Sequence, residues 1–151
     1  MKLIKTGLVS LSVRTGDFSG NTALLMDAIE EAGKAGVQLL IAPELAVSGY
    51  NLQSLGMWRN TARQSWASLA EIAAACDGMT AIVGVPVLYH GSLRSGAAVI
   101  SDKIISGIVL RETAAAFPPL SRIDSLLNGV SAGQLSFDMP WGTLLPSFDT
   151  D

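Results

Sequence analysis

The sequence is poor in the residue types on which several kinds of functional site depend. Its 151 residues include one cysteine, Cys76, and one histidine, His90. A single cysteine excludes an internal disulfide framework. A single histidine without cysteines or acidic residues clustered around it does not predict a metal site. We therefore expect neither a disulfide-stabilised fold nor a bound metal, and the cysteine content favours a cytoplasmic protein.

Charge is also scarce. Charged residues make up 15% of the chain and the net charge is −3. No basic cluster is present, which argues against nucleic acid as a partner. Apolar residues make up 49% of the chain, but no run approaches the roughly 18 uncharged apolar residues of a membrane-spanning helix. We therefore expect no membrane partner, and the apolar excess predicts that part of the surface is covered in a homo-oligomer or by a partner subunit.

Several well-known catalytic and cofactor motifs are missing. The chain has neither of the glycine-rich patterns that bind nucleotide phosphates, so no nucleotide cofactor is expected. It also lacks a Gly-x-Ser-x-Gly segment, and His90 alone, in an expected turn, does not support a Ser-His-Asp triad. No other cofactor motif is present, so we expect none to be bound.

The elements that are present alternate between strands and helices. This order predicts an α/β fold in which two helices cover one face of a sheet. We expect one domain over residues 1–151, with residues 112–136 mostly irregular. Asn21 is expected to cap the first helix, and Pro86 is expected to mark the end or the edge of its strand. The expected elements are a strand at 3–13, a helix at about 21–35, a strand at 37–42, a helix at 55–76, a strand at 80–88 and a hairpin of 97–101 with 104–110.

The most informative stretch follows the apolar strand 37–42. Pro43 ends this strand because it cannot donate to a ladder, and Glu44 comes next. Open α/β sheets keep their binding crevices beyond the carboxyl ends of their strands, so Glu44 is expected in a pocket, close to the turn at Tyr50. A buried carboxylate must be hydrogen-bonded or used. Two interpretations stay open: Glu44 pairs with Arg59 or Arg63 or caps a turn, or it is a general base.

The second expected helix carries the cysteine and two tryptophans on one apolar stripe. Trp58 and Trp66 are expected in the core or at an interface, because they recur at helical spacing. Cys76 lies on the same stripe with no cationic residue beside it, so we interpret it as a structural thiol.

Several segments together resemble a known family. Gly16-Asp-Phe-Ser-Gly-Asn21, Pro43-Glu-Leu-Ala-Val-Ser-Gly-Tyr50 and Val83-Gly-Val-Pro86 stand in the order seen in the nitrilase (carbon–nitrogen hydrolase) superfamily. The first two look most like the glutaminase domain of glutamine-dependent NAD synthetases. The resemblance covers roughly residues 5 to 111. It implies an α-β-β-α sandwich, of which this chain corresponds to roughly the N-terminal half.

The resemblance also implies roles for individual residues. In the family, a glutamate activates a cysteine that attacks an amide or nitrile carbon, and a lysine stabilises the charge that develops. Glu44 matches the general base, and Tyr50 is expected to contact substrate. The lysine position carries Glu112 or a neighbour, and no lysine follows Lys103.

The nucleophile position is also altered. The segment that corresponds to it places Pro146 or Ser147 where the family has its cysteine, and both assignments remain open. Ser147 is a poor replacement, because a hydroxyl is far harder to ionise than a thiol.

Two functional hypotheses follow. The first is a carbon–nitrogen hydrolase-like domain that has lost catalysis and serves as a binding or assembly module. The second is a fragment or subunit of an active amidohydrolase of the NAD synthetase type, completed by another chain or by a longer parent.

Overall fold

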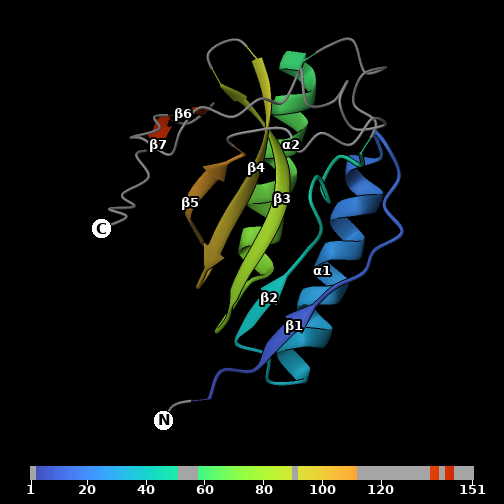
Figure 1. The fold of residues 1–151 in the computed structure, drawn as a ribbon, viewed down its shortest axis with the longest axis vertical. Coiled ribbons are helices and arrows are strands. Elements are labelled where there is room, and N and C mark those ends of the chain that lie inside the picture. The colour runs from blue at the N-terminus through green and yellow to red at the C-terminus, as the bar shows by residue number, and fades with distance from the viewer. Residues whose placement is uncertain (1–2, 51–57, 90–91, 112–136, 140–141, 145–151) are drawn as a thin grey trace.

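The computed structural model describes the backbone of residues 3–50, 58–89, 92–111, 137–139 and 142–144, and the side chains of residues 3–50, 60–89 and 93–111. Figure 1 shows an α/β fold, as the sequence predicts. The elements, in chain order, are β1 (Thr6–Leu8), α1 (Phe18–Lys34), β2 (Leu39–Ile41), α2 (Trp58–Ala75), β3 (Thr80–Tyr89), β4 (Ser92–Ser101), β5 (Ile104–Leu110), β6 (Phe137–Met139) and β7 (Gly142–Leu144).

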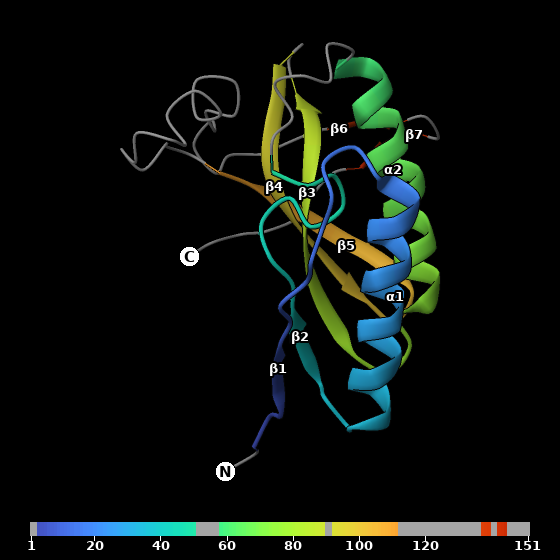
Figure 2. The same ribbon diagram turned by 90° about the vertical axis from the view of Figure 1, so that its right-hand side faces the viewer.

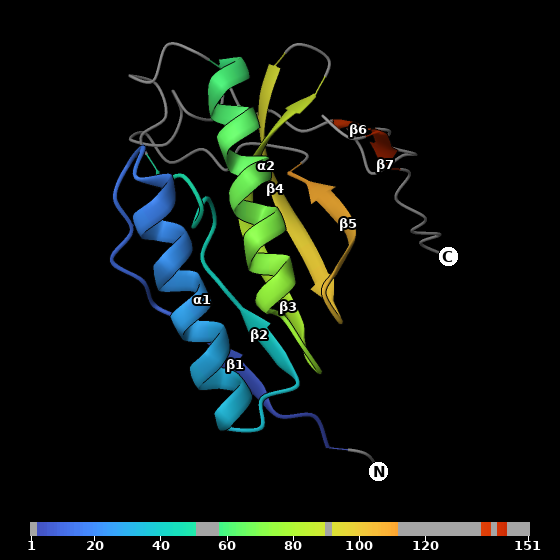
Figure 3. The same ribbon diagram turned by 180° about the vertical axis from the view of Figure 1, so that it is seen from behind.

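Five strands form one mixed sheet in the order β1-β2-β3-β4-β5. The first three strands are parallel, joined by α1 and α2 as crossovers, and β3, β4 and β5 are antiparallel neighbours. Figure 2 shows both helices on the same face of this sheet. Figure 3, from behind, shows α1 over β1 and β2 and α2 over β3 and β4. The strands β6 and β7 form a separate two-stranded sheet.

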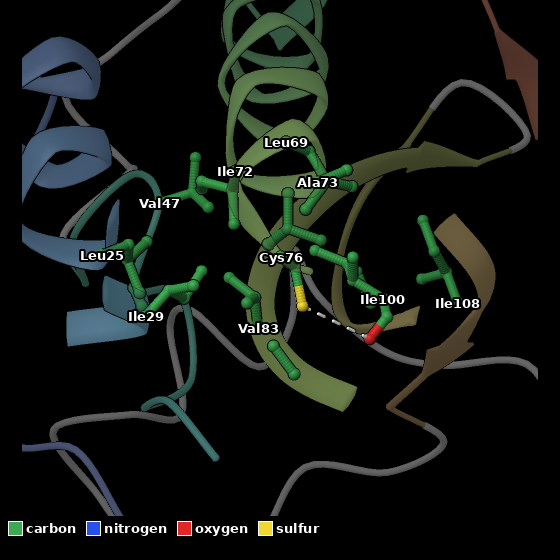
Figure 4. Packing of buried hydrophobic residues seen from close by; sticks show 14 of the residues in the cluster. Leu25, Ile29, Val47, Leu69, Ile72, Ala73, Cys76, Val83, Ile100 and Ile108 are labelled. Carbon is green, nitrogen blue, oxygen red and sulfur yellow. Dashed lines mark hydrogen bonds between the residues drawn. The ribbon is translucent and has the colours of Figure 1, made fainter. Parts of the chain in front are cut away.

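The core lies between the helices and the sheet. Figure 4 shows Leu25 and Ile29 from α1 and Ile72 from α2 converging on Val83 and Ile100. Trp66 belongs to this cluster and is 3% exposed, so it packs inside its own chain. The side chain of Trp58 lies outside the described residues.

The predicted cap of the first helix is wrong, and the prediction for Pro86 is correct in one of its two forms. Asp17, rather than Asn21, caps α1, and its carboxylate accepts a hydrogen bond from the backbone N–H of Gly20 at 3.0 Å. Pro86 does not end its strand, because β3 continues to Tyr89. Pro86 does lie at an edge, the other predicted alternative, because β2 pairs with β3 only over residues 80–82 and β3 has no ladder on that side at Pro86 among the described strands. A proline is tolerated at such a position.

Candidate functional site

The turn after β2 sets the position of Glu44. Leu45 adopts a positive φ of 51° although it is not glycine, and its carbonyl accepts hydrogen bonds from the backbone N–H groups of Ser48 and Gly49. Left-handed backbone at a non-glycine residue is uncommon and is often found at functional sites. The tight turn places the Glu44 side chain over the end of the sheet.

Gly84 on β3 allows this turn to approach the sheet. A Cβ at residue 84 would lie 2.3 Å from the carbonyl oxygen of Pro43 and 2.6 Å from the Cα of Glu44. The carbonyl of Gly84 also accepts a hydrogen bond from the N–H of Val47 at 3.2 Å. Glycine at residue 84 therefore lets the turn that carries Glu44 lie directly against β3.

A buried asparagine anchors the other side of the turn. Asn21 is 1% exposed. Its amide donates to the carbonyls of Arg14 at 2.8 Å and Val47 at 3.2 Å, and its side-chain oxygen accepts from the N–H of Arg14 at 2.8 Å. Gly49 packs against the same loop, since a Cβ there would lie 2.6 Å from the Cα of Thr15. The two segments that resemble the family, residues 16–21 and 43–50, thus form one structural unit.

Three side chains from three separate segments donate hydrogen bonds to the Glu44 carboxylate. Tyr50 donates its hydroxyl to Oε2 at 2.6 Å, and Ser95 on β4 donates its hydroxyl to Oε1 at 2.7 Å. Arg111, directly after β5, forms an ion pair with Oε1 at 3.1 Å. Both partners of this ion pair are largely buried, with 28% of the Arg111 side chain and 32% of the Glu44 side chain exposed.

These donors determine the charge state of Glu44. Burial by itself raises the pKa of Glu44, but the hydrogen bonds from Tyr50 and Ser95 and the charge of Arg111 outweigh burial, so the pKa lies below the ordinary value of 4.5. The ionised form is therefore favoured at neutral pH. A carboxylate with a lowered pKa is a weaker proton acceptor than one raised toward neutral pH.

The carboxylate faces a pocket of about 370 Å³ on the side of the sheet opposite the helices. Its walls are mostly small or apolar, and its polar groups are Glu44, Ser95 and Arg111. Such a pocket has the size and mixture of surfaces typical of a small-molecule site. The ion pair leaves little net charge in it, so its polar end suits a ligand that both donates and accepts hydrogen bonds.

Cys76 is far from this chemistry. It lies at the end of α2, is fully buried, and its thiol points toward the carbonyls of Met79 and Ile100, as Figure 4 shows for Ile100. Burial raises the pKa of the Cys76 thiol. This agrees with its interpretation as a structural thiol and not a nucleophile.

The structure brings together some of the expected site residues. Glu44 lies in a pocket next to Tyr50, as predicted. The role of Glu44 as general base and the contact of Tyr50 with substrate stay predictions. Its ion-pair partner is Arg111, so the expected pairing with Arg63 is wrong. The Arg59 side chain, Glu112, Pro146 and Ser147 lie outside the described residues.

Sequence reasoning missed Ser95 and Arg111. Ser95 is 51 residues from Glu44 and Arg111 is 67 residues away, and no local pattern indicates such contacts. The one available signal was the register of the hairpin, which places the residue after β5 beside Ser95: the N–H of Arg111 donates to the Ser95 carbonyl at 2.9 Å.

The described residues hold neither a candidate metal site nor a helix that could cross a membrane. No group of three or more His, Cys, Asp or Glu side chains there could hold a metal ion. Within the same residues, no helix is long and apolar enough to cross a membrane.

Comparison with known proteins assigns the family. The sequence model of the carbon-nitrogen hydrolases matches residues 5–110. The chain is 28% identical over 91 residues to the glutamine-dependent NAD(+) synthetase of Oryza sativa subsp. indica, a match that covers 59% of this chain and 12% of that protein. The chain therefore spans only a small part of the length of the curated relatives it matches.

Solved structures show the same fold. A glutamine-dependent NAD(+) synthetase from Cytophaga hutchinsonii matches with a TM-score of 0.82 at 22% identity, over 94% of this chain and 24% of that one. A mutant of the Nesterenkonia AN1 amidase from the nitrilase superfamily matches with a TM-score of 0.69 at 19% identity, over 90% and 52% of the two chains. With residues 5–110 matched, the chain belongs to the carbon-nitrogen hydrolase family, and this domain is related to the glutaminase part of NAD(+) synthetases.

Proposed function

We propose that this chain is a non-catalytic carbon-nitrogen hydrolase domain, a binding or assembly module in which Glu44 has no nucleophile to activate. The observation that carries the proposal is the setting of Glu44. Its carboxylate receives hydrogen bonds from Tyr50, Ser95 and Arg111 and has a lowered pKa. A general base works best with a pKa near the operating pH, so this carboxylate is arranged for structure and binding.

The available nucleophiles support the same proposal. Cys76, the only cysteine of the sequence, is buried in the core and is not among the residues that line the pocket. Ser95 is in the pocket and donates to Glu44, but a carboxylate with a lowered pKa cannot readily remove a proton from a hydroxyl. Removing one member of a cooperating catalytic set already costs orders of magnitude in rate.

The chemistry of the pocket indicates what it would bind. A primary carboxamide such as that of glutamine can accept a hydrogen bond from Arg111 and donate one to Glu44, without adding charge next to an ion pair. Relatives of this chain are named as glutamine-dependent NAD(+) synthetases. We propose a small amide as the ligand, held without hydrolysis.

A second candidate function rests on how little of its relatives the chain spans, which is 24% of the Cytophaga hutchinsonii synthetase chain. In this alternative, Glu44 serves a glutamine-hydrolysing site whose cysteine and lysine come from another chain or a longer parent. Arg111 would then have to release Glu44, because the base must reach the incoming nucleophile.

The test is ammonia release from glutamine by the purified chain, beside a Glu44→Ala control. We expect no turnover above the control and a heat of glutamine binding that the control loses. Turnover on the order of 1 per second, ordinary for an enzyme, that disappears in Glu44→Ala would contradict the proposal. Ammonia release that needs a second chain would instead support the alternative.

A further inference from the structure

A second cavity lies between α1 and α2, which Figure 3 shows side by side. Its volume is about 390 Å³. Residues between 16 and 26 line it from α1 and the loop before α1, and residues between 64 and 71 line it from α2. It shares no lining residue with the pocket that Glu44 faces. We call this second cavity the interhelical groove.

The interhelical groove contains a buried hydroxyl without a partner. Ser68 lines the groove, is 6% exposed, and makes no hydrogen bond with any residue that the structure describes. Two other hydroxyls of these helices, those of Thr22 and Ser65, donate to backbone carbonyls one turn earlier, each at 2.7 Å. Buried polar groups normally have a hydrogen-bond partner. The Ser68 hydroxyl therefore indicates that a polar group of a ligand enters the groove.

The charges of the interhelical groove have one sign. Asp17 and Glu71 line it, and none of its described lining residues is lysine, arginine or histidine. Oδ1 of Asp17 accepts a hydrogen bond from the N–H of Gly20 at 3.0 Å, whereas Oδ2 accepts none within the described part of the chain. Glu71 forms no ion pair with a described residue. The groove therefore favours a cation that donates hydrogen bonds.

The two carboxylates lie at opposite ends of the interhelical groove. Both helices run in the same direction, because each connects two neighbouring parallel strands. Asp17 is therefore at the end that Gln64 lines, and Glu71 is at the end that Met26 lines. Residues 64 and 71 are seven positions apart, a rise of roughly 10 Å along a helix. Ala67 lines the groove between these ends, so the middle suits an aliphatic chain.

We propose that the interhelical groove binds a linear aliphatic polyamine. Its terminal ammonium groups pair with Asp17 and Glu71, and its methylene groups pack against Ala67 and Met26. Ser68 lies between residues 64 and 71, so its hydroxyl accepts a hydrogen bond from an inner secondary ammonium group. This inference goes beyond the proposed function, because no residue of the Glu44 pocket takes part in it.

Isothermal titration calorimetry of the full chain with spermidine, a linear triamine, tests the proposal. We expect saturable binding at low ionic strength that weakens as salt is added, because salt screens exposed ion pairs. Asp17→Asn should weaken binding at least about threefold and keep the cap of α1, since asparagine caps a helix as well as aspartate does. Glu71→Gln should weaken binding by a similar factor.

Ser68→Ala distinguishes a ligand site from a structural role. Without spermidine, this variant should be at least as stable as the native protein, because the lost hydroxyl bonds to no described residue and alanine is the better helix former. Its affinity for spermidine should fall about threefold. A lower Tm without spermidine, together with an unchanged affinity, would contradict the role of Ser68 in binding.

Two control variants and one control compound complete the experiment. Asp27→Asn removes the same charge from α1 outside the interhelical groove and should leave binding unchanged, as should Glu44→Ala. Hexylamine has a single ammonium group and should bind more weakly than spermidine. The proposal is overturned if spermidine gives no saturable heat or if hexylamine binds equally well. It is also overturned if Asp27→Asn or Glu44→Ala weakens binding as much as Glu71→Gln, because net charge or the other pocket then accounts for the binding.

Discussion

Three donors favour the ionised form of Glu44, whose side chain is 32% exposed. Burial opposes ionisation, while Tyr50, Ser95 and Arg111 favour it and outweigh burial. Two of these donors are neutral hydroxyls and one is a charged guanidinium. Charge-assisted hydrogen bonds are stronger than neutral ones, so this small network holds the turn, β4 and the end of β5 together.

This network should make stability depend on pH in a defined direction. The pKa of Glu44 in the folded protein lies below its ordinary value of 4.5. A lowered pKa means that the network stabilises the protein above that ordinary value, and that this contribution is lost as pH falls through the folded-state pKa. Glu44→Gln should therefore lower the free energy of unfolding by about 1 kcal/mol near neutral pH.

Thermal unfolding at neutral pH and at successively lower pH, below the ordinary value of 4.5, measures this effect. The difference in Tm between the native protein and Glu44→Gln should shrink at the lower pH. Asp27→Asn, on the exposed side of α1, is the control and should change Tm little at neutral pH. A difference between native protein and Glu44→Gln that stays constant across this range would contradict the ionised state assigned to Glu44.

At the scale of single elements, local patterns predicted the fold well and the site in part. The strand and helix order followed from periodicity, and the hairpin followed from Asp102-Lys103, where both residues have positive φ as two-residue hairpin turns require. The cap of α1 was misplaced because Asp17 and Asn21 are both good capping residues, and only the tertiary structure assigns Asn21 to the neighbouring turn. The Glu44–Arg111 pair joins residues 67 positions apart, so no short-range rule could reveal it.

The close contact between β3 and the Glu44 turn should make Gly84 intolerant of a side chain. In Gly84→Ala, the new Cβ would overlap the backbone at Pro43 and Glu44, and backbone atoms cannot swing aside as a flexible side chain can. We expect a loss of about 1–3 kcal/mol in the free energy of unfolding, together with weaker ligand binding because Glu44 moves.

Urea denaturation measures this loss, and Gly33→Ala is the matched control. Gly33 lies within α1, and its new Cβ would come no closer than 3.8 Å to Met79. Because alanine is a better helix former than glycine, Gly33→Ala should stabilise the protein by about 0.5–1 kcal/mol. Equal effects of the two substitutions would show that the turn does not depend on the close approach at Gly84.

The loop before α1 and the turn after β2 should lose their connection in Asn21→Ala. This substitution removes three hydrogen bonds and leaves the carbonyl of Val47 without its side-chain donor. Unsatisfied buried groups cost roughly 1–3 kcal/mol each, so we expect a loss of about 2–4 kcal/mol. The control is Asn60→Ala at an exposed position of α2, which should change stability by less than about 0.5 kcal/mol. A comparable loss in both variants would argue against the anchoring role of Asn21.

At the scale of the whole molecule, the sheet is unevenly supported. The helices cover one face, and the pairing is extensive in the middle and short at one edge. β3 and β4 pair over ten residues, whereas β1 pairs with β2 over three. Leu3, Ile4 and Leu8 around this edge are all more than 60% exposed. The centre of the sheet should therefore open only with the whole molecule, and the β1 edge should open locally.

Amide hydrogen exchange tests this gradient. Amides that join β3 to β4 should exchange at rates set by global unfolding, because Val83, Val85 and Ala98 on these strands are fully buried under α2. Amides of β1 should exchange at least about a hundredfold faster, since breaking a three-residue ladder exposes little surface. If β1 were protected as strongly as β3, the edge of β1 that has no partner among the described strands would have to be paired with another strand.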